Sequence, residues 1–209
     1  EDIFGAGADV ITSGNHIWNK KETKEFMLHE PRLLRPSNYP TGAPGLGFFI
    51  ANTLQGPVAV INLMGRVFMP PVDCPFQEAN RLLKNLDSNV RMIFVDFHAE
   101  ATSEKVALGW HLDGRVSAVI GTHTHIQTAD ERVLPQGTAF LSDAGMTGPA
   151  DSVIGIKTSI AVGKFLSGIP NRFEVSGGRG QINGVLVEVN PESGRANSIL
   201  RISEQEDSG

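Results

Sequence analysis

Val116-Ser117-Ala118-Val119-Ile120-Gly121-Thr122-His123-Thr124-His125 is the stretch that decides the fold. Its first five residues are small or apolar and β-branched in part, which predicts a buried strand over 116–120. Residues two apart in extended backbone point to the same side, so we expect His123 and His125 to face one point beyond the strand. Open α/β sheets bind ligands at this carboxyl edge, and imidazole is a common metal ligand. The stretch therefore predicts half of a metal site, although an isolated His-x-His pair is more often a polar loop.

A second apolar run, 91–97, ends directly at His98. Residues 103–111 predict a helix that stops at Asp113-Gly114, so the order is strand, helix, strand within about 30 residues. Units of this kind are parallel and right-handed. His98 and His123 should therefore emerge at the same edge of one sheet.

A third β-type run, 8–12, ends at Ser13-Gly14-Asn15-His16, a turn that carries an amide and an imidazole. Four of the six histidines in the chain thus follow predicted strands, whereas His29 and His111 fall in predicted helices. Packing alone does not explain why histidines follow strands in this way. Their placement therefore favours a metal site over histidines that only stabilise the fold.

The rest of the chain predicts further elements of a mixed α/β protein. Two β runs separated by Gln55-Gly56-Pro57 indicate a hairpin, either in a second sheet or as an antiparallel edge. The loop 143–149 is rich in glycine, and the role of Asp143 in it is left open. The predicted helices are 19–29, 76–86, 103–111 and 156–166; the remaining predicted strands are 46–53, 58–64, two short ones within 132–142, 185–189 and 198–202, before a charged tail that should fray.

Composition limits the possible functions. At 209 residues the chain is long enough for a substantial core, and a net charge of -5 argues against a broad nucleic-acid-binding face. A nucleotide substrate remains compatible, because bound metal would supply positive charge. Cys74 is the single cysteine, and no apolar run reaches the roughly 18 residues that span a bilayer. Without a signal segment at its start, the chain is expected in the cytoplasm, and a homo-oligomer is left open.

Gly14-Asn15-His16, His98 and Gly121-x-His123-x-His125 resemble the Gly-Asn-His, His and Gly-His-x-His blocks of calcineurin-like metallophosphoesterases. The longer stretches 12–18, 98–105, 121–130 and 145–149 are similar to one bacterial branch of them, the YmdB-like phosphodiesterases. The resemblance covers nearly the whole chain.

The resemblance implies a single α/β domain over residues 1–209, a four-layer α/β/β/α sandwich of the metallophosphoesterase type with two divalent ions at its strand ends. Asn15, His98 and His123 would bind one ion and His125 the other, and the metals would be iron or manganese, with zinc as the alternative. A hydroxide bridging the ions would attack a small phosphodiester, such as the cyclic nucleotide 2′,3′-cyclic AMP. His16 would protonate the leaving alkoxide. Glu100 would either bond a ligating histidine or start the following helix.

Two departures from the family pattern affect this prediction. The family opens with a strand that carries a metal-binding Asp and with an Asn-Gly-Glu-Asn segment, and neither is present, so we expect the first βαβ portion to lie before Glu1. Ile17 stands where many relatives have an acid that could orient the imidazole of His16. Another group must then orient that ring.

Two alternatives stay open. One is another metal hydrolase, such as an amidohydrolase, although those enzymes carry His-x-His on the first strand of a barrel, and here the pair comes late. The other is a non-catalytic regulator or an inactive truncated form of the same fold, because the carboxylate ligands are missing from the sequence.

Overall fold

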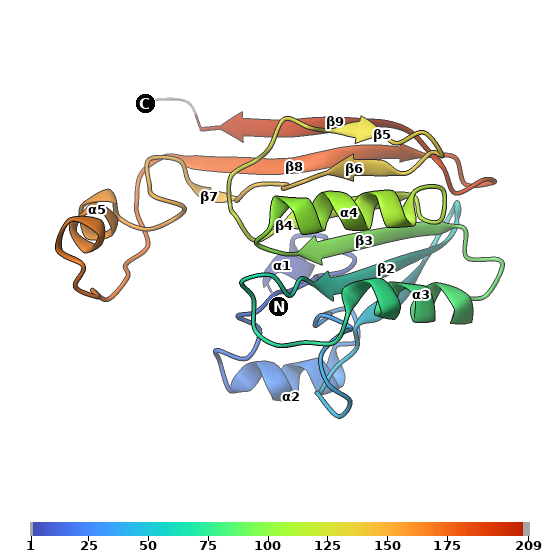
Figure 1. The fold of residues 1–209 in the computed structure, drawn as a ribbon, viewed down its shortest axis with the longest axis horizontal. Coiled ribbons are helices and arrows are strands. Elements are labelled where there is room, and N and C mark those ends of the chain that lie inside the picture. The colour runs from blue at the N-terminus through green and yellow to red at the C-terminus, as the bar shows by residue number, and fades with distance from the viewer. Residues whose placement is uncertain (1, 207–209) are drawn as a thin grey trace.

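The computed structural model describes residues 2–206, which form two sheets (Figure 1). One is six-stranded, in the order β1-β2-β3-β4-β6-β5, and the other is three-stranded, in the order β7-β8-β9. The strands are β1 (Phe48–Thr53), β2 (Gly56–Met64), β3 (Met92–His98), β4 (Ala118–Thr122), β5 (Arg132–Val133), β6 (Ala139–Leu141), β7 (Gly148–Pro149), β8 (Gly180–Val189) and β9 (Ala196–Gln205); the helices are α1 (Asp2–Gly5), α2 (Glu22–His29), α3 (Pro75–Asn85), α4 (Thr102–Leu112) and α5 (Thr158–Ser167).

The centre of the larger sheet is parallel. β2, β3, β4 and β6 run in the same direction, whereas β1 and β5 pair antiparallel at the two edges. The predicted strand-helix-strand unit around α4 is therefore confirmed, and the predicted hairpin is an antiparallel edge of this sheet. Because parallel neighbours end at the same side, β3 and β4 deliver their last residues to one edge.

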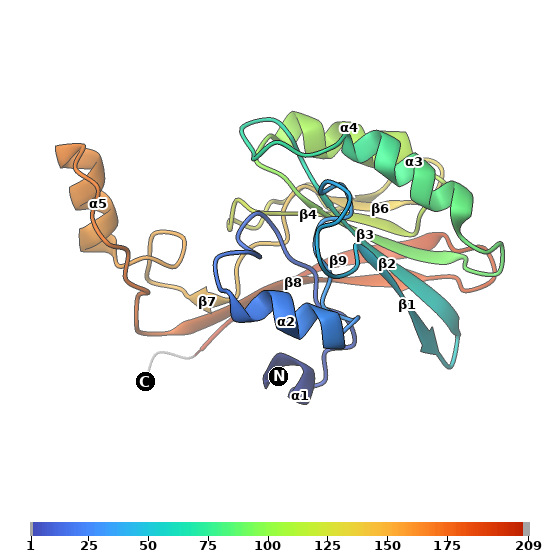
Figure 2. The same ribbon diagram turned by 90° about the horizontal axis from the view of Figure 1, so that it is seen from below.

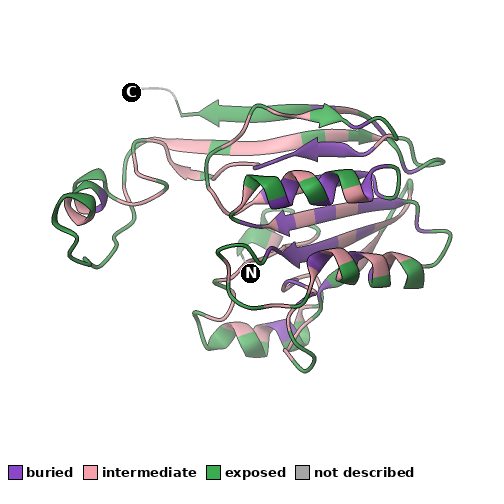
Figure 3. Ribbon diagram, in the orientation of Figure 1, coloured by how far each residue is buried: buried purple, intermediate pink, exposed green. Residues whose placement is uncertain are grey.

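One face of the large sheet is covered by α3 and α4 (Figure 2). Alternate residues of β3, namely Ile93, Val95 and Phe97, point to this side and pack with Leu108 and Leu112 of α4. Each fully buried side chain of this kind stabilises the fold by about 1.5–3 kcal/mol. Burial is concentrated here, in the central strands and the inner sides of the helices (Figure 3).

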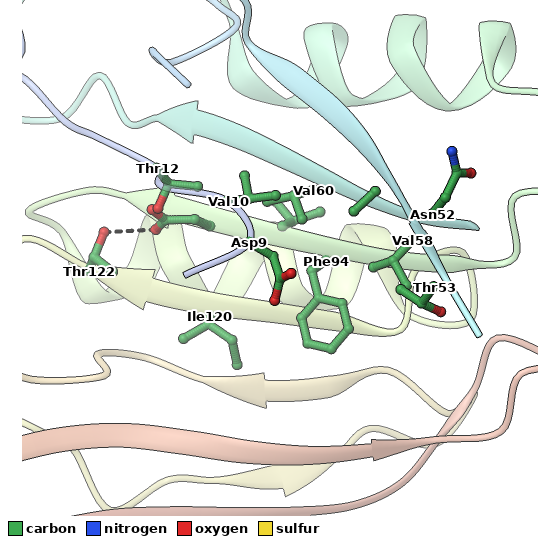
Figure 4. A pocket seen from close by; sticks show the side chains of 13 residues that line it. Asp9, Val10, Thr12, Asn52, Thr53, Val58, Val60, Phe94, Ile120 and Thr122 are labelled. Atoms are coloured by element: carbon green, nitrogen blue, oxygen red, sulfur yellow. Dashed lines mark hydrogen bonds between the residues drawn. The ribbon is translucent and has the colours of Figure 1, made fainter. Parts of the chain in front are cut away.

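The opposite face of the large sheet is shared by two segments. Over β4 and β6 it packs against Val185 and Val187 of β8 and Ile199 of β9. Over β2, β3 and β4 it lies under residues 9–12, with a cavity of about 520 Å³ between them (Figure 4). Residues 2–206 thus build three layers, α/β/β, and α5 projects away from them (Figure 2).

The prediction of a strand over 8–12 is wrong. Within it only Ile11 makes a β-bridge, to Leu33. The Ile11 amide donates to Arg32 O and the Leu34 amide donates to Ile11 O, so this segment pairs with one residue of a loop and not with a sheet. β-propensity alone does not produce a strand without a neighbouring ladder.

The other predicted elements are found with shifted ends. α2 begins three residues later than predicted, because 15–20 form turns, and β8 and β9 are longer than predicted. The predicted fraying tail falls partly on residues 207–209, which lie outside the described residues. None of the helices in 2–206 is long and apolar enough to cross a bilayer.

Candidate metal centre

The carboxyl ends of β3 and β4 bring the histidines of two motifs together. His98 is the last residue of β3 and lies in register with Thr122, the last residue of β4. The ring centroids of His98 and His123 are 4.8 Å apart at an interplanar angle of 75°. His123 Nδ1 lies 3.1 Å from His98 Nε2, and Asn15 Oδ1 lies 2.9 Å from the same nitrogen. Residues from three distant parts of the sequence therefore converge on His98 Nε2.

The glycines of both motifs allow this close approach. A Cβ at Gly14 would overlap the imidazole of His98, with Nε2 as the nearest atom. A Cβ at Gly121 would overlap the carbonyl oxygen of Ser142, at the end of the neighbouring strand β6. Only glycine lets the turn before Asn15 and the end of β4 come this near to their neighbours.

His123 and His125 do not lie in extended backbone, so the argument from alternating strand residues is wrong. Their φ angles are +105° and +68°, and the chain turns at both residues. His123 joins His98, whereas His125 Nδ1 lies 3.1 Å from the carbonyl oxygen of Ile154. Positive φ at a non-glycine residue costs about 1–3 kcal/mol, so the surroundings must hold this turn.

Asp143, at the end of β6, holds the turn through Thr124. Its Oδ2 accepts hydrogen bonds from the amide (3.0 Å) and the hydroxyl (2.7 Å) of Thr124 and from Lys105 Nζ (2.7 Å), and its Oδ1 accepts one from the Gly145 amide. Burial raises the pKa of Asp143, but the hydrogen bonds from Lys105 and Thr124 outweigh it and leave that pKa below its ordinary value. The ionised carboxylate therefore fixes the backbone between the two histidines.

Burial keeps the two clustered imidazoles neutral. It lowers the pKa of His98 to about 4, and the charge of Lys105, or a proton on His123, acts in the same direction. Burial also lowers the pKa of His123, and Glu100, whose Oε2 lies 2.9 Å from His123 Nε2, offsets part of that effect. Neutral imidazole is the form that binds metal ions.

The sequence of this chain matches the family model of YmdB-like proteins over residues 1–202. The chain belongs to the YmdB-like protein family. It is 48% identical over 200 residues to a 2′,3′-cyclic-nucleotide 2′-phosphodiesterase of Bacillus subtilis, covering 96% of this chain and 76% of that protein. This shows that the family resemblance noted in the sequence is correct.

Two solved structures are similar to the YmdB-like chain over its whole length. A hypothetical protein from Thermus thermophilus matches with a TM-score of 0.92 and 39% identity, over 98% of this chain and 79% of that one. A phosphatase from Mycoplasma pneumoniae matches with a TM-score of 0.91 and 35% identity, over 98% of this chain and 75% of that one. The mixed α/β fold is therefore that of known phosphatase structures.

The donor set of this YmdB-like site fits a divalent cation. A neutral imidazole carries one ring proton. The Nδ1 atom of His98 lies beside the hydroxyl of Thr122, and its Nε2 atom faces both Asn15 Oδ1 and His123 Nδ1. A cation at that point would accept electron pairs from all three. Amide oxygen with imidazole suits iron, manganese or zinc. Among the described residues no three His, Cys, Asp or Glu side chains are grouped so that they could hold a metal ion.

His16 is exposed beside the cluster, close enough to His98 to influence its pKa. Asn19 Nδ2 lies 3.1 Å from His16 Nδ1. Asn19 therefore contacts the His16 ring, next to which Ile17 offers no acid.

Sequence reasoning missed Asp96, Thr122 and Lys105 and left Asp143 open. Asp96 interrupts an otherwise apolar strand, and burial raises its pKa to about 6. Lys105 lies on the apolar side of α4 with Leu108 and Leu112. A charged residue at a position that the pattern assigns to the core was the available signal for both.

Proposed function

We propose that this chain is a metal-dependent phosphodiesterase that hydrolyses small phosphodiesters, with cyclic nucleotides such as 2′,3′-cyclic AMP as its substrate class. The observation that carries the proposal is the convergence of Asn15 Oδ1 and His123 Nδ1 on His98 Nε2 at one sheet edge, with His16 beside it. The activity after which the Bacillus subtilis relative is named, that of a 2′,3′-cyclic-nucleotide 2′-phosphodiesterase, supports the substrate class. A second ion at His125 and the fourth layer of the sandwich belong to the same proposal.

A phosphodiester is an anion that repels a nucleophile carrying negative charge. Bound divalent cations would neutralise its oxygens and lower the pKa of water. The chain's own contribution to that chemistry is to present neutral imidazoles and an amide oxygen in a fixed arrangement. The Asp143–Thr124 contacts hold His123, and Gly14 lets Asn15 approach His98. Positioned groups of this kind need no reorganisation during the reaction.

His16 would protonate the alkoxide that leaves phosphorus. The Asn19 amide can donate its N–H to the Nδ1 of neutral His16 or, turned over, accept from the N–H of the protonated ring. It can therefore orient both forms of a general acid, and Nε2 is the nitrogen available for proton transfer.

The test compares two substrates in the presence of Mn²⁺. Cyclic AMP with a 2′,3′ phosphodiester releases a basic alkoxide, whereas bis-p-nitrophenyl phosphate releases a stable phenolate that needs no proton. We expect His16→Ala to reduce kcat on the cyclic nucleotide by about 100-fold or more, with a smaller loss on the phenyl ester. Metal content, measured by elemental analysis, should not change.

His29→Ala is the matched control, because His29 is an exposed histidine at the end of α2. It should leave both rates unchanged. Turnover of amide substrates without turnover of phosphodiesters would move the assignment to an amidohydrolase-like activity. Equal losses on the two esters would remove the general-acid role from His16.

A second candidate is a non-catalytic regulator that keeps the fold. It is favoured by one observation: within residues 2–206 no three His, Cys, Asp or Glu side chains are grouped so that they could hold a metal ion. Metal-loaded protein that binds a cyclic nucleotide and does not hydrolyse it would support this alternative.

A further inference from the structure

Three side chains form a line of hydrogen bonds behind the cluster. Thr122 Oγ1 donates to Asp96 Oδ1 at 2.8 Å, which is the dashed line in Figure 4, and His98 Nδ1 lies 3.0 Å from the same hydroxyl oxygen. The side chain of Thr12 lies near Asp96 as well and acts to lower its pKa. Asp96 and Thr122 line the cavity under residues 9–12, whereas His98 and His123 do not.

The direction of these bonds fixes a proton on His98. A hydroxyl has one hydrogen, and Thr122 gives it to the carboxylate, so toward His98 the oxygen can only accept. His98 Nδ1 then carries the ring proton, which leaves a lone pair on Nε2; Asn15 Oδ1 can only accept, so two acceptors face each other at the point where a cation would bind. That nitrogen is the one that faces Asn15 Oδ1 at 2.9 Å and His123 Nδ1 at 3.1 Å.

We propose that Asp96 and Thr122 are positioning residues that hold the proton of His98 on Nδ1 and so present Nε2 to a divalent cation. The inference rests on the metal site of the proposed function. A carboxylate that orients a metal-binding imidazole is a general device, and here a threonine hydroxyl stands between the two groups.

The strand geometry explains why the hydroxyl is needed. Asp96 and His98 are two apart in β3 and point to the same face, which puts their Cα atoms about 7 Å from each other. Thr122 lies opposite His98 in β4 and points to that face as well. Its short side chain can therefore reach the carboxylate and the ring at the same time.

The test reads the tautomer and the metal affinity separately. In metal-free protein at neutral pH, ¹⁵N NMR of the imidazoles should show His98 protonated on Nδ1, and Thr122→Ser, which keeps the hydroxyl, should preserve that signal. Thr122→Val should shift the proton partly or wholly to Nε2. Zn²⁺ affinity, measured by chelator competition, should fall by about 10–100-fold in Thr122→Val and stay near wild type in Thr122→Ser.

Thr138→Val is the matched control. Thr138 is a buried threonine whose hydroxyl donates to the carbonyl oxygens of Leu112 and Val116, but it lies away from the cluster. It should lower stability without moving the His98 tautomer or the Zn²⁺ affinity. If Thr122→Val does not fold, Thr122→Ala removes the same hydroxyl with a smaller side chain.

An unchanged His98 tautomer in both hydroxyl-free variants would overturn the inference, as would equal Zn²⁺ affinity in Thr122→Ser and Thr122→Val. Absence of Zn²⁺ binding to the wild-type protein would overturn it too. Failure of the proposed function is a different result: the tautomer and affinity would respond as described, while no phosphodiester is hydrolysed.

Discussion

Replacing Lys105 with methionine should destabilise the protein by about 3 kcal/mol, at the lower end of the 3–5 kcal/mol typical of a broken buried ion pair. The pair joins Lys105 Nζ to Asp143 Oδ2 at 2.7 Å, and the side chains are 2% and 1% exposed. Methionine matches the length of lysine but leaves the Asp143 carboxylate buried without its cation. The lower end applies because Thr124 and the Gly145 amide still donate to Asp143.

Urea unfolding followed by circular dichroism measures this loss, and the melting temperature should fall by about 6–12 °C for a chain of this size. Lys157→Met is the control, because Lys157 pairs with Glu174 at the surface at 2.6 Å, with side chains 48% and 56% exposed. That variant should lose less than about 1 kcal/mol. The double variant Lys105→Met with Asp143→Asn should recover part of the loss, since no buried charge is left unpaired.

A loss below about 1 kcal/mol in Lys105→Met would refute the reasoning, because it would mean that the Asp143 carboxylate is not buried as a charge. The pH dependence of stability at acid pH gives an independent check. The pKa of folded Asp143 is below its ordinary value, so its contribution is present above pH 4 and is lost as the pH falls through the folded pKa. Asp143→Asn should therefore approach wild-type stability as the pH falls in that acid range.

Three further outcomes are expected. Gly14→Ala should lower the free energy of unfolding in urea by about 1–3 kcal/mol and weaken Zn²⁺ binding by at least tenfold, since its Cβ would overlap the His98 ring. The control Gly163→Ala, in α5 with open space around it, should be neutral or stabilising. The free energy of unfolding of metal-free protein should fall by up to about 3 kcal/mol from pH 6.5 to pH 4. In this range His98 of the unfolded chain takes up a proton, whereas folded His98, with its pKa near 4, does not. If His98→Gln left this pH dependence of stability unchanged, the explanation would be contradicted. Asn19→Leu should reduce kcat on 2′,3′-cyclic AMP by about tenfold and kcat on bis-p-nitrophenyl phosphate by less, because it removes the amide that orients His16. Equal effects on the two substrates would argue against this orienting role of Asn19.

The local sequence pattern was enough to predict much of the strand and helix arrangement. The apolar runs that became β3 and β4, with the helix between them, predicted a parallel pair and put His98 and His123 at one edge, because handedness and strand direction follow from the order of elements along the chain. The resemblance of Gly14-Asn15-His16 to a family motif selected Asn15, which the structure places 2.9 Å from His98.

The details of the site required the tertiary structure. Residues 8–12 have the composition of a strand but make only a single bridge, to Leu33. His123 and His125 leave extended backbone where Asp143, bonded to Lys105, holds Thr124 between them. The proton on His98 depends in the same way on Thr122 and Asp96. Sequence by itself determined which residues end strands; tertiary contacts alone decided their φ angles and hydrogen-bond partners, because a strained turn or a buried charge persists only where groups from other segments surround it.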